Sequence, residues 1–380
     1  MASLTVLGQN SRESTSSKRG QESNKTGTIM TPRARSVAAL TGNMPDRVPC
    51  VPLVDTSYAA ACAKLPVSEC FLNPEAYAAA LVATLDRHPA IDGVSINIGL
   101  SSDVVVEHTR HSGTHRVKTT GGLTWMVPEN DIGSVEHCEI KDFRDPRLAT
   151  DEYLMPACLR TLRAIPKKYR EKYLINTTVT GPFSQIAFLV GLDPIMVGTI
   201  EDADDLLHAI ERRVPFALKW VDALAELDPG SIWIGEGFAS NSLLGRASYR
   251  KFVMPFEKQV VDRIHSIGKT ALLHICGKLD QSLESTLETG ADGAEIDWQV
   301  NIAQAKRRVG TRLTLKGNLN TATLVRSKPD EVYALTREII VQGKPDGRFI
   351  VSSGCCLGRD TPPENVDAMV RACEDDGAYS

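Results

Sequence analysis

The sequence predicts an α/β protein of the (β/α)8 TIM-barrel class, with a β-rich insertion after the second strand and a disordered N-terminal tail. Eight apolar runs of strand length recur along the chain, and each is followed by Gly, Asn, Asp or Ser and then by a helical period. Strands that alternate with helices in this way form a parallel sheet, and eight repeats predict a closed barrel. Such a barrel takes about 250 residues, which leaves about 100 of residues 31–380 for insertions.

The expected strands and helices follow in order from this pattern. The strands are 48–54, 93–98, 174–179, 232–234, 270–276, 293–296, 312–315 and 348–352. The helices are 74–87, 202–227, 247–267, 279–288, 329–341 and 363–373. Pro74, Pro329 and Pro363 each stand where a helix begins, because proline is favoured in the first helical turn.

Two segments lie outside the regular alternation. Residues 1–30 are rich in Ser, Thr, Asn and Gln without apolar periodicity, so we expect a disordered tail before one TIM-barrel domain of residues 31–380. Residues 104–131 alternate apolar and polar residues and contain the turn dipeptide Gly121-Gly122, which predicts a β-rich insertion over the C-terminal rim of the barrel. The insertion holds His108, His111 and His115, which are spaced three and four residues apart. That spacing would bring side chains together on a helix but not on the extended chain expected here. We therefore expect exposed polar residues instead of a metal cluster.

Composition narrows the class of function. The 43 Lys and Arg residues against 47 Asp and Glu give a net charge of −4, so no basic surplus points to nucleic acid or an anionic membrane. No apolar stretch of about 20 residues predicts a membrane span, and the N-terminus lacks the apolar core of a secretory signal. We therefore expect a cytoplasmic protein whose 9 cysteines are thiols or metal ligands.

A candidate metal site stands at the end of the fifth expected strand. His274 and Cys276 are two residues apart, so their side chains share one face, and imidazole and thiolate are ligands suited to zinc. Taken alone, this pair reads more readily as a buried His beside a buried Cys. Cys355 follows the eighth strand, and residues that cap strands five and eight of a narrow barrel can meet near its axis. Three ligands with a fourth position open are the pattern of catalytic zinc.

The chain resembles the uroporphyrinogen decarboxylase superfamily, and within it the zinc-dependent corrinoid methyltransferases, such as methylcobamide:coenzyme M methyltransferases. The resemblance runs from about residue 31 to the C-terminus. It is carried by TPRARSVAALTGNMPDRVPCVPL from residue 31, VTGPFSQIAFLVG at 179–191, YRKFVMPFEKQVVDRIH at 249–265, LLHICG at 272–277, TGADGAEID at 289–297, LKGNLN at 315–320 and SGCCLGRDTPPENVDAMV at 353–370. The resemblance implies that His274, Cys276 and Cys355 bind Zn²⁺, while Cys356, one residue off, points elsewhere.

The resemblance also implies a reaction. It suggests transfer of a methyl group between a corrinoid and a small thiol, ether, amine or halide, with the corrinoid (cobalamin) carried by a separate corrinoid protein. Zinc at the open position activates the methyl acceptor or donor. Classical decarboxylases of the superfamily carry an arginine-rich stretch that holds substrate carboxylates, and residues 52–58 lack an arginine pair.

Other polar residues at strand ends are expected to face the same mouth of the barrel. Glu236 and Asp297 are the candidate catalytic residues, and Asn97 and Asn318 are the candidate substrate-binding residues. The competing expectation is that each side chain only caps the helix that follows it. Two other functions remain open from the sequence: a decarboxylase without a cofactor, and a non-catalytic barrel with a structural zinc site.

Overall fold

The computed structural model describes residues 29–97, 99–131, 133–149 and 154–379. Its main sheet is parallel and has the order β1-β6-β7-β8-β9-β10-β11, which is the chain order of its strands. These strands are β1 (Gly93–Ile96), β6 (Leu174–Thr180), β7 (Ser231–Gly235), β8 (Ala271–Ile275), β9 (Gly293–Ile296), β10 (Thr314–Leu319) and β11 (Phe349–Ser353). Nearly all of their residues are buried, as expected for a sheet covered by helices on its outer face. The structure confirms the predicted α/β barrel class.

The first expected strand, 48–54, is not a strand, and this is a correction to the sequence prediction. The segment makes one parallel bridge, between Cys50 and Val351 on β11. On its other side, the Asp92 amide donates to the Cys50 carbonyl at 2.7 Å, immediately before β1. The segment thus stands between β11 and β1 in the place of an eighth strand. Pro49 and Pro52 lack the amide hydrogens that a longer ladder requires.

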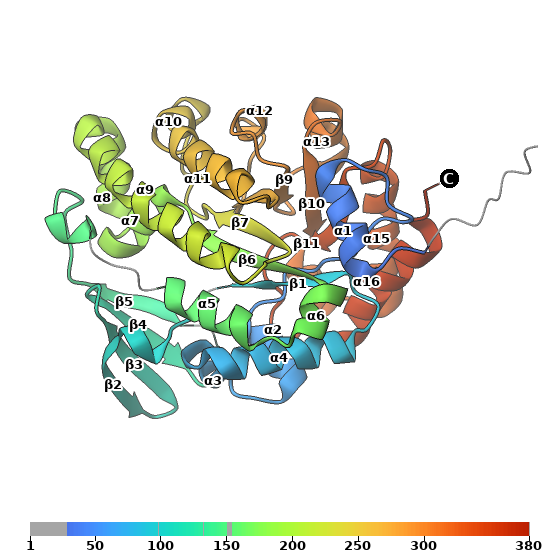
Figure 1. The fold of residues 1–380 in the computed structure, drawn as a ribbon, viewed down its shortest axis with the longest axis horizontal. Helices are drawn as coiled ribbons and strands as arrows, with labels where there is room; N and C mark the ends of the chain where they lie inside the picture. The colour runs from blue at the N-terminus through green and yellow to red at the C-terminus, as the bar shows by residue number, and fades with distance from the viewer. Residues whose placement is uncertain (1–28, 98, 132, 150–153, 380) are drawn as a thin grey trace, which may run out of the picture.

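Helices surround the sheet, and their order follows the predicted alternation (Figure 1). They are α1 (Pro32–Thr41), α2 (Thr56–Ala63), α3 (Val67–Leu72), α4 (Pro74–Arg87), α5 (Met155–Ala164), α6 (Lys167–Lys172), α7 (Pro182–Val190), α8 (Leu192–Glu201), α9 (Ala203–Ala225), α10 (Arg246–Phe252), α11 (Met254–Ser266), α12 (Leu283–Glu288), α13 (Ile302–Val309), α14 (Thr321–Arg326), α15 (Pro329–Gly343) and α16 (Pro363–Asp376). The expected helix 247–267 is two helices, because Val253 leaves the helical conformation one residue before α11, which has Pro255 in its first turn.

The insertion after β1 forms a second sheet, which is antiparallel and has the order β2-β3-β4-β5. Its strands are β2 (Val105–His111), β3 (Thr114–Thr119), β4 (Leu123–Pro128) and β5 (Ser134–Cys138). This confirms the predicted β-rich insertion and extends it beyond residue 131. The sheet stands apart from the barrel strands beside α3 and α7 (Figure 1).

The disordered tail and the absence of a membrane span are the two remaining expectations from the sequence. The expected tail, residues 1–30, lies outside the described residues except for Ile29 and Met30. Within the described ranges no single helix is both long and apolar enough to cross a membrane; α7 and α8 reach that length and composition only as a pair, bent by 117°.

Candidate metal centre

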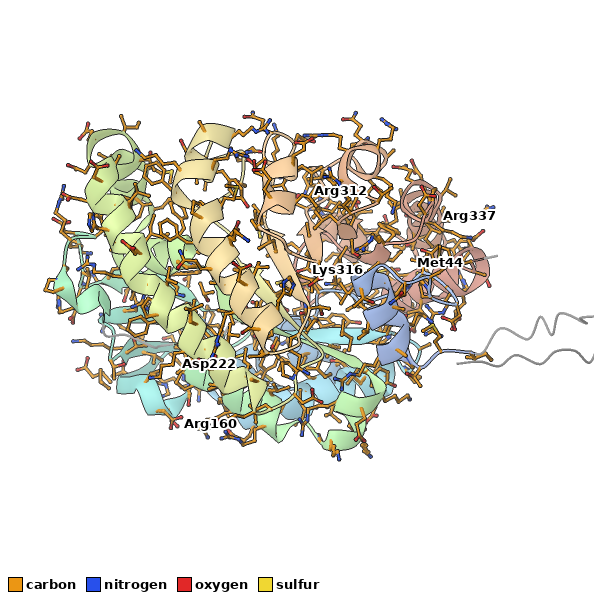
Figure 2. All side chains as sticks on the ribbon, turned by 45° about the horizontal axis from the view of Figure 1, so that its top comes forward. Met44, Arg160, Asp222, Arg312, Lys316 and Arg337 are labelled. Atoms are coloured by element: carbon orange, nitrogen blue, oxygen red, sulfur yellow. The ribbon has the colours of Figure 1, made fainter. Side chains whose placement is uncertain are left out.

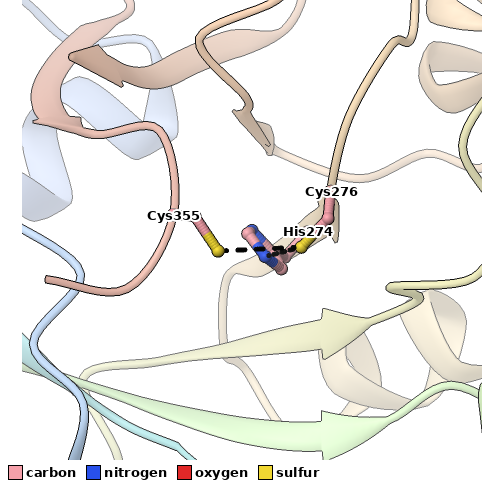
Figure 3. Close-up of side chains that lie close together, drawn as sticks. All are labelled: His274, Cys276 and Cys355. Atoms are coloured by element: carbon pink, nitrogen blue, oxygen red, sulfur yellow. Dashed lines mark hydrogen bonds between the residues drawn. The ribbon is translucent and has the colours of Figure 1, made fainter. Parts of the chain in front are cut away.

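Three side chains with metal-binding atoms converge at the carboxyl ends of β8 and β11. His274 is the fourth residue of β8, Cys276 directly follows this strand, and Cys355 follows β11 by two residues. His274 Nε2 lies 3.1 Å from Cys276 Sγ, which lies 3.8 Å from Cys355 Sγ. Figure 3 shows the two sulfur atoms and the imidazole ring pointing toward one another from two separate segments. Within the described residues they form the one group of three such ligands, with all ligand atoms within 4.8 Å of one another.

The spacing of these atoms fits a zinc ion. Tetrahedral bonds of about 2.0 Å to nitrogen and about 2.3 Å to sulfur place neighbouring ligand atoms roughly 3.5–3.8 Å apart. The separation of 3.8 Å between the two sulfur atoms matches this value, and the separation of 3.1 Å between imidazole and sulfur is somewhat shorter. Two thiolates and one imidazole are also the ligand types that zinc prefers, and three protein ligands leave one position for another molecule.

The imidazole of His274 is held from its other side by a buried charged pair. His274 Nδ1 lies 3.1 Å from Glu295 Oε2 on β9, and Glu295 Oε1 contacts the ammonium group of Lys316 on β10. Glu295 and Lys316 are both fully buried, and Lys316 lies within the body of the molecule while Arg160 and Arg337 lie at its periphery (Figure 2). The Trp233 ring packs edge-on against His274, with centroids 5.0 Å apart. A carboxylate this close to Nδ1 favours the tautomer that leaves Nε2 unprotonated toward the sulfur atoms, as partners of metal-binding imidazoles do in other proteins.

The electrostatic surroundings favour the thiolate form of Cys355 in this cluster. Hydrogen bonds from Cys276 and Cys356, together with the nearby His274, hold the pKa of Cys355 far below its usual range. The hydrogen bond with Cys355 and burial both raise the pKa of Cys276. Burial alone would lower the pKa of His274, but the Cys276 and Cys355 sulfurs raise it to about 10. The three residues therefore share protons, and a bound cation would replace these protons.

Glu236 lies beside the cluster, but its carboxylate serves another element. Its backbone amide donates to the His274 carbonyl at 2.9 Å. Its two carboxylate oxygens accept hydrogen bonds from the amides of Phe183, at 3.2 Å, and Ser184, at 2.9 Å, in the first turn of α7. Burial raises the pKa of Glu236 to about 7, against the effect of these hydrogen bonds. The structure thus gives the predicted catalytic carboxylate a helix-capping contact.

Asp297 and Asn318 hold the loop that follows β9. Asp297 Oδ1 accepts a hydrogen bond from the Gln299 amide at 3.0 Å. Asn318 Nδ2 donates to the carbonyls of Asp297, at 3.0 Å, and Val300, at 2.7 Å. Asn318 is 8% exposed and Asp297 is 6% exposed, so both side chains are nearly enclosed. The helix that follows Asn318 is capped by Asn320 instead.

Asn97 borders a cavity of about 450 Å³ beside the metal cluster. The side-chain amide of Asn97 donates to Cys356 Sγ at 2.9 Å, and both residues line the cavity. Cys356 thus lines the cavity and lies outside the group of three metal-binding side chains. Asp55 also lines this cavity and caps α2, and its burial raises its pKa to about 6. Of the four polar residues predicted at strand ends, Asn97 is the one that lines this cavity.

The sequence does not predict the apolar wall of this cavity. It includes four aromatic residues from different elements: Phe71, Trp125, Phe188 and Phe238. They lie far apart in the sequence, and no local pattern brings them together. Lys316 was also missed, although a lysine within a strand-forming run is a signal, because lysine is rarely fully buried without a partner.

The three histidines of the insertion lie on β2 and β3, and within the described residues they are not among the groups of three close metal-binding atoms. His108 Nε2 lies 2.8 Å from His115 Nδ1 across β2 and β3. His108 and His111 are exposed and His115 is half-buried. These positions agree with the expectation of polar surface residues.

The fold and the converging side chains define an α/β-barrel protein with a His/Cys/Cys group that could hold a metal ion at the carboxyl ends of its strands. The chain belongs to the uroporphyrinogen decarboxylase (URO-D) family, whose model matches residues 31–375.

Several relatives carry the names of methyltransferases. A methylated-thiol--coenzyme M methyltransferase of Methanosarcina mazei is 25% identical over 255 residues, which are 67% of this chain and 67% of that protein. The methylcobamide:CoM methyltransferase MtbA of the same organism is 26% identical over 218 residues, 57% of this chain and 62% of that protein. The chain thus spans about two thirds of the length of these relatives. This similarity supports the corrinoid methyltransferase branch of the family.

A solved structure supports the fold. A methyltransferase from Methanosarcina mazei superposes with a TM-score of 0.76 at 24% identity, over 91% of this chain and 99% of that chain. At this identity the likeness establishes the shared barrel fold.

Proposed function

We propose that this protein is a zinc-dependent methyltransferase that moves a methyl group between a corrinoid and a small thiol, ether, amine or halide. The observation that carries the proposal is the convergence of His274, Cys276 and Cys355 beside an apolar cavity. The methyltransferase names of the relatives support it. We assign the reaction to the cytoplasm, because none of the 9 cysteines forms a disulfide and disulfides are rare in that compartment.

Bound zinc would act as a Lewis acid that makes a thiol acceptor more nucleophilic or a departing heteroatom a better leaving group. The chain's own residues supply the frame for this chemistry. His274, Cys276 and Cys355 would hold the ion, and Glu295 would keep His274 in the tautomer that exposes Nε2. The cavity beside Cys356 would hold the non-corrinoid substrate away from water. We propose that residues 31–380 act as a single barrel domain and that the corrinoid arrives on a separate protein.

A decarboxylase without a cofactor is the second candidate, favoured by one comparison. A uroporphyrinogen decarboxylase of Coxiella burnetii is 33% identical over 135 residues, 35% of this chain. A porphyrinogen carries several carboxylates, and such groups are recognised by arginine and lysine. Among the described residues no arginine or lysine lines the cavity beside the cluster, which disfavours this candidate.

Metal content and corrinoid chemistry together test the proposal. The full chain purified with zinc is expected to hold one ion, and Cys276→Ala and Cys355→Ala are expected to lose it. Cys356→Ala is the matched control for metal content, because this neighbouring thiol lies outside the ligand group. The zinc-loaded chain should change the corrinoid absorbance when methylcobalamin is added with thiols, or cob(I)alamin with methyl donors. The metal-free chain should not. Full activity of a metal-free preparation would contradict the proposal.

A further inference from the structure

Two histidines of the insertion meet through a tight hairpin, which their sequence spacing does not reveal. β2 and β3 are joined by Ser112 and Gly113, whose φ values of 48° and 77° are those of a two-residue type I′ turn. This turn pairs His115 with Arg110, and His108 stands two residues before Arg110 on the same face. His108 and His115 are therefore diagonal neighbours, within reach of each other's side chains. The hairpin stands at the outer edge of the molecule, well away from β11 (Figure 1).

The two imidazole rings face each other nitrogen to nitrogen. His108 Nε2 lies 2.8 Å from His115 Nδ1, and the ring centroids are 5.1 Å apart. A hydrogen bond between two ring nitrogens needs one donor and one acceptor, so at least one ring is neutral and offers a lone pair. A divalent cation can replace the shared proton and take a lone pair from each ring.

The surroundings of this histidine pair suit a cation on one side of the hairpin. The guanidinium of Arg110 is already paired, because its Nη2 lies 3.5 Å from Glu129 Oε1. Glu129 is held at the turn, since its amide donates to the Gly113 carbonyl at 2.8 Å. Val117 and Val127, on the same face of the sheet as the histidines, are fully buried. The pair thus stands at the border between apolar packing and solvent, beside a carboxylate.

The distance between the two nitrogens separates the classes of metal ion. Nitrogens at neighbouring corners of a square, each about 2.0 Å from an ion, lie about 2.8 Å apart, whereas tetrahedral corners place them about 3.3 Å apart. The observed 2.8 Å matches the square arrangement. Square-planar coordination by nitrogen is typical of Cu(II) and Ni(II), and Cu(II) is the tighter binder of the two.

We propose that His108 and His115 form a surface site for Cu(II), in which the two imidazoles take neighbouring corners of a square and water takes the others. The ion would link β2 to β3 and so stiffen the hairpin. The site has no sulfur ligand, unlike the His274, Cys276 and Cys355 cluster. It is independent of the proposed methyl transfer.

Titration of the zinc-loaded full chain with CuCl2, followed by electron paramagnetic resonance, tests this proposal. One equivalent of Cu(II) should give an axial signal with nitrogen coupling. His108→Ala and His115→Ala should each weaken Cu(II) binding at least about tenfold, because one of two protein ligands is lost. His111→Ala is the matched control and should bind Cu(II) as the unaltered chain does, since His111 is exposed on the opposite face of β2.

Copper drawn to the cysteines is recognised by a separate measurement. The titration is repeated on the full chain with Cys276→Ser and Cys355→Ser, which should keep the nitrogen-coupled signal. Loss of the signal in this chain would place the copper at the cysteine cluster and overturn the proposal. A signal of unchanged affinity in His115→Ala would overturn it as well.

A gain of affinity guards against variants that only disturb the hairpin. Arg110→His places a third imidazole opposite His115 on the same face. It should tighten Cu(II) binding about tenfold relative to Arg110→Ala, which removes the same positive charge without adding a ligand. Equal Cu(II) affinity of the two Arg110 variants would overturn the proposal.

Discussion

Glu295 Oε2 lies 3.1 Å from Nδ1 of His274, while Nε2 of the same ring faces the Cys276 sulfur. A carboxylate at Nδ1 places the ring proton there and leaves the lone pair of Nε2 for a metal. Lys316 contacts the other carboxylate oxygen, so the three side chains form a buried chain across β8, β9 and β10.

Replacing Glu295 should therefore weaken metal binding without removing a ligand. We expect Glu295→Gln to lower zinc affinity by about 10- to 100-fold, the usual effect of losing such a contact. Competition with a chromophoric chelator measures this affinity. Glu284→Gln is the matched control, because Glu284 pairs with Arg308 on the surface and lies outside the ligand group. Zinc affinity equal to that of the unaltered chain would show that Glu295 does not position His274.

Asp92 is expected to stabilise the place where the barrel closes. It is fully buried, with Oδ1 2.5 Å from Arg35 and Oδ2 2.9 Å from Arg47 and 2.8 Å from the Cys50 amide. Asp92→Asn leaves two cationic side chains without their buried partner and should lower the free energy of unfolding by about 3–5 kcal/mol.

Denaturant unfolding followed by circular dichroism measures this change. The control is Asp262→Asn, which breaks an exposed pair with Lys258 and should cost less than about 1 kcal/mol. Equal, small losses in both variants would mean that the segment around Cys50 closes the barrel without help from Asp92.

The sequence predicts well those features that depend on local spacing. The candidate ligands His274 and Cys276 share a face because strand side chains alternate, and Cys355 lies beside them because parallel strands all end at one rim. The features that local spacing does not predict depend on contacts between distant segments or on single residues. Proline at 49 and 52 prevents a ladder in an otherwise strand-like run, and the carboxylate of Glu236 turns to α7, which no spacing reveals.

Gly181 should be intolerant of a side chain because of Glu236. A Cβ at this position would lie 2.0 Å from Glu236 Oε1, whereas a Cβ at Gly245 would meet nothing within 4 Å. Both glycines are helix N-caps with extended backbone, so Gly245→Ala is a matched control for Gly181→Ala. We expect Gly181→Ala to lower the free energy of unfolding by about 1–3 kcal/mol more than the control. Equal melting temperatures for the two variants would contradict the capping contact.

Lys306 should make stability depend on alkaline pH. Its ammonium donates to the carbonyls of Gly310, at 3.2 Å, and Gly347, and burial lowers its pKa to about 8 from an ordinary value of 10.5. Between these two values the unfolded chain binds more protons than the folded chain, so stability rises with pH in this window. Denaturation at pH 8 and pH 10 should show a smaller rise, or a larger fall, for Lys306→Met than for the unaltered chain. Lys258→Met, on the surface, should follow the unaltered chain, and identical pH profiles for all three would contradict the lowered pKa.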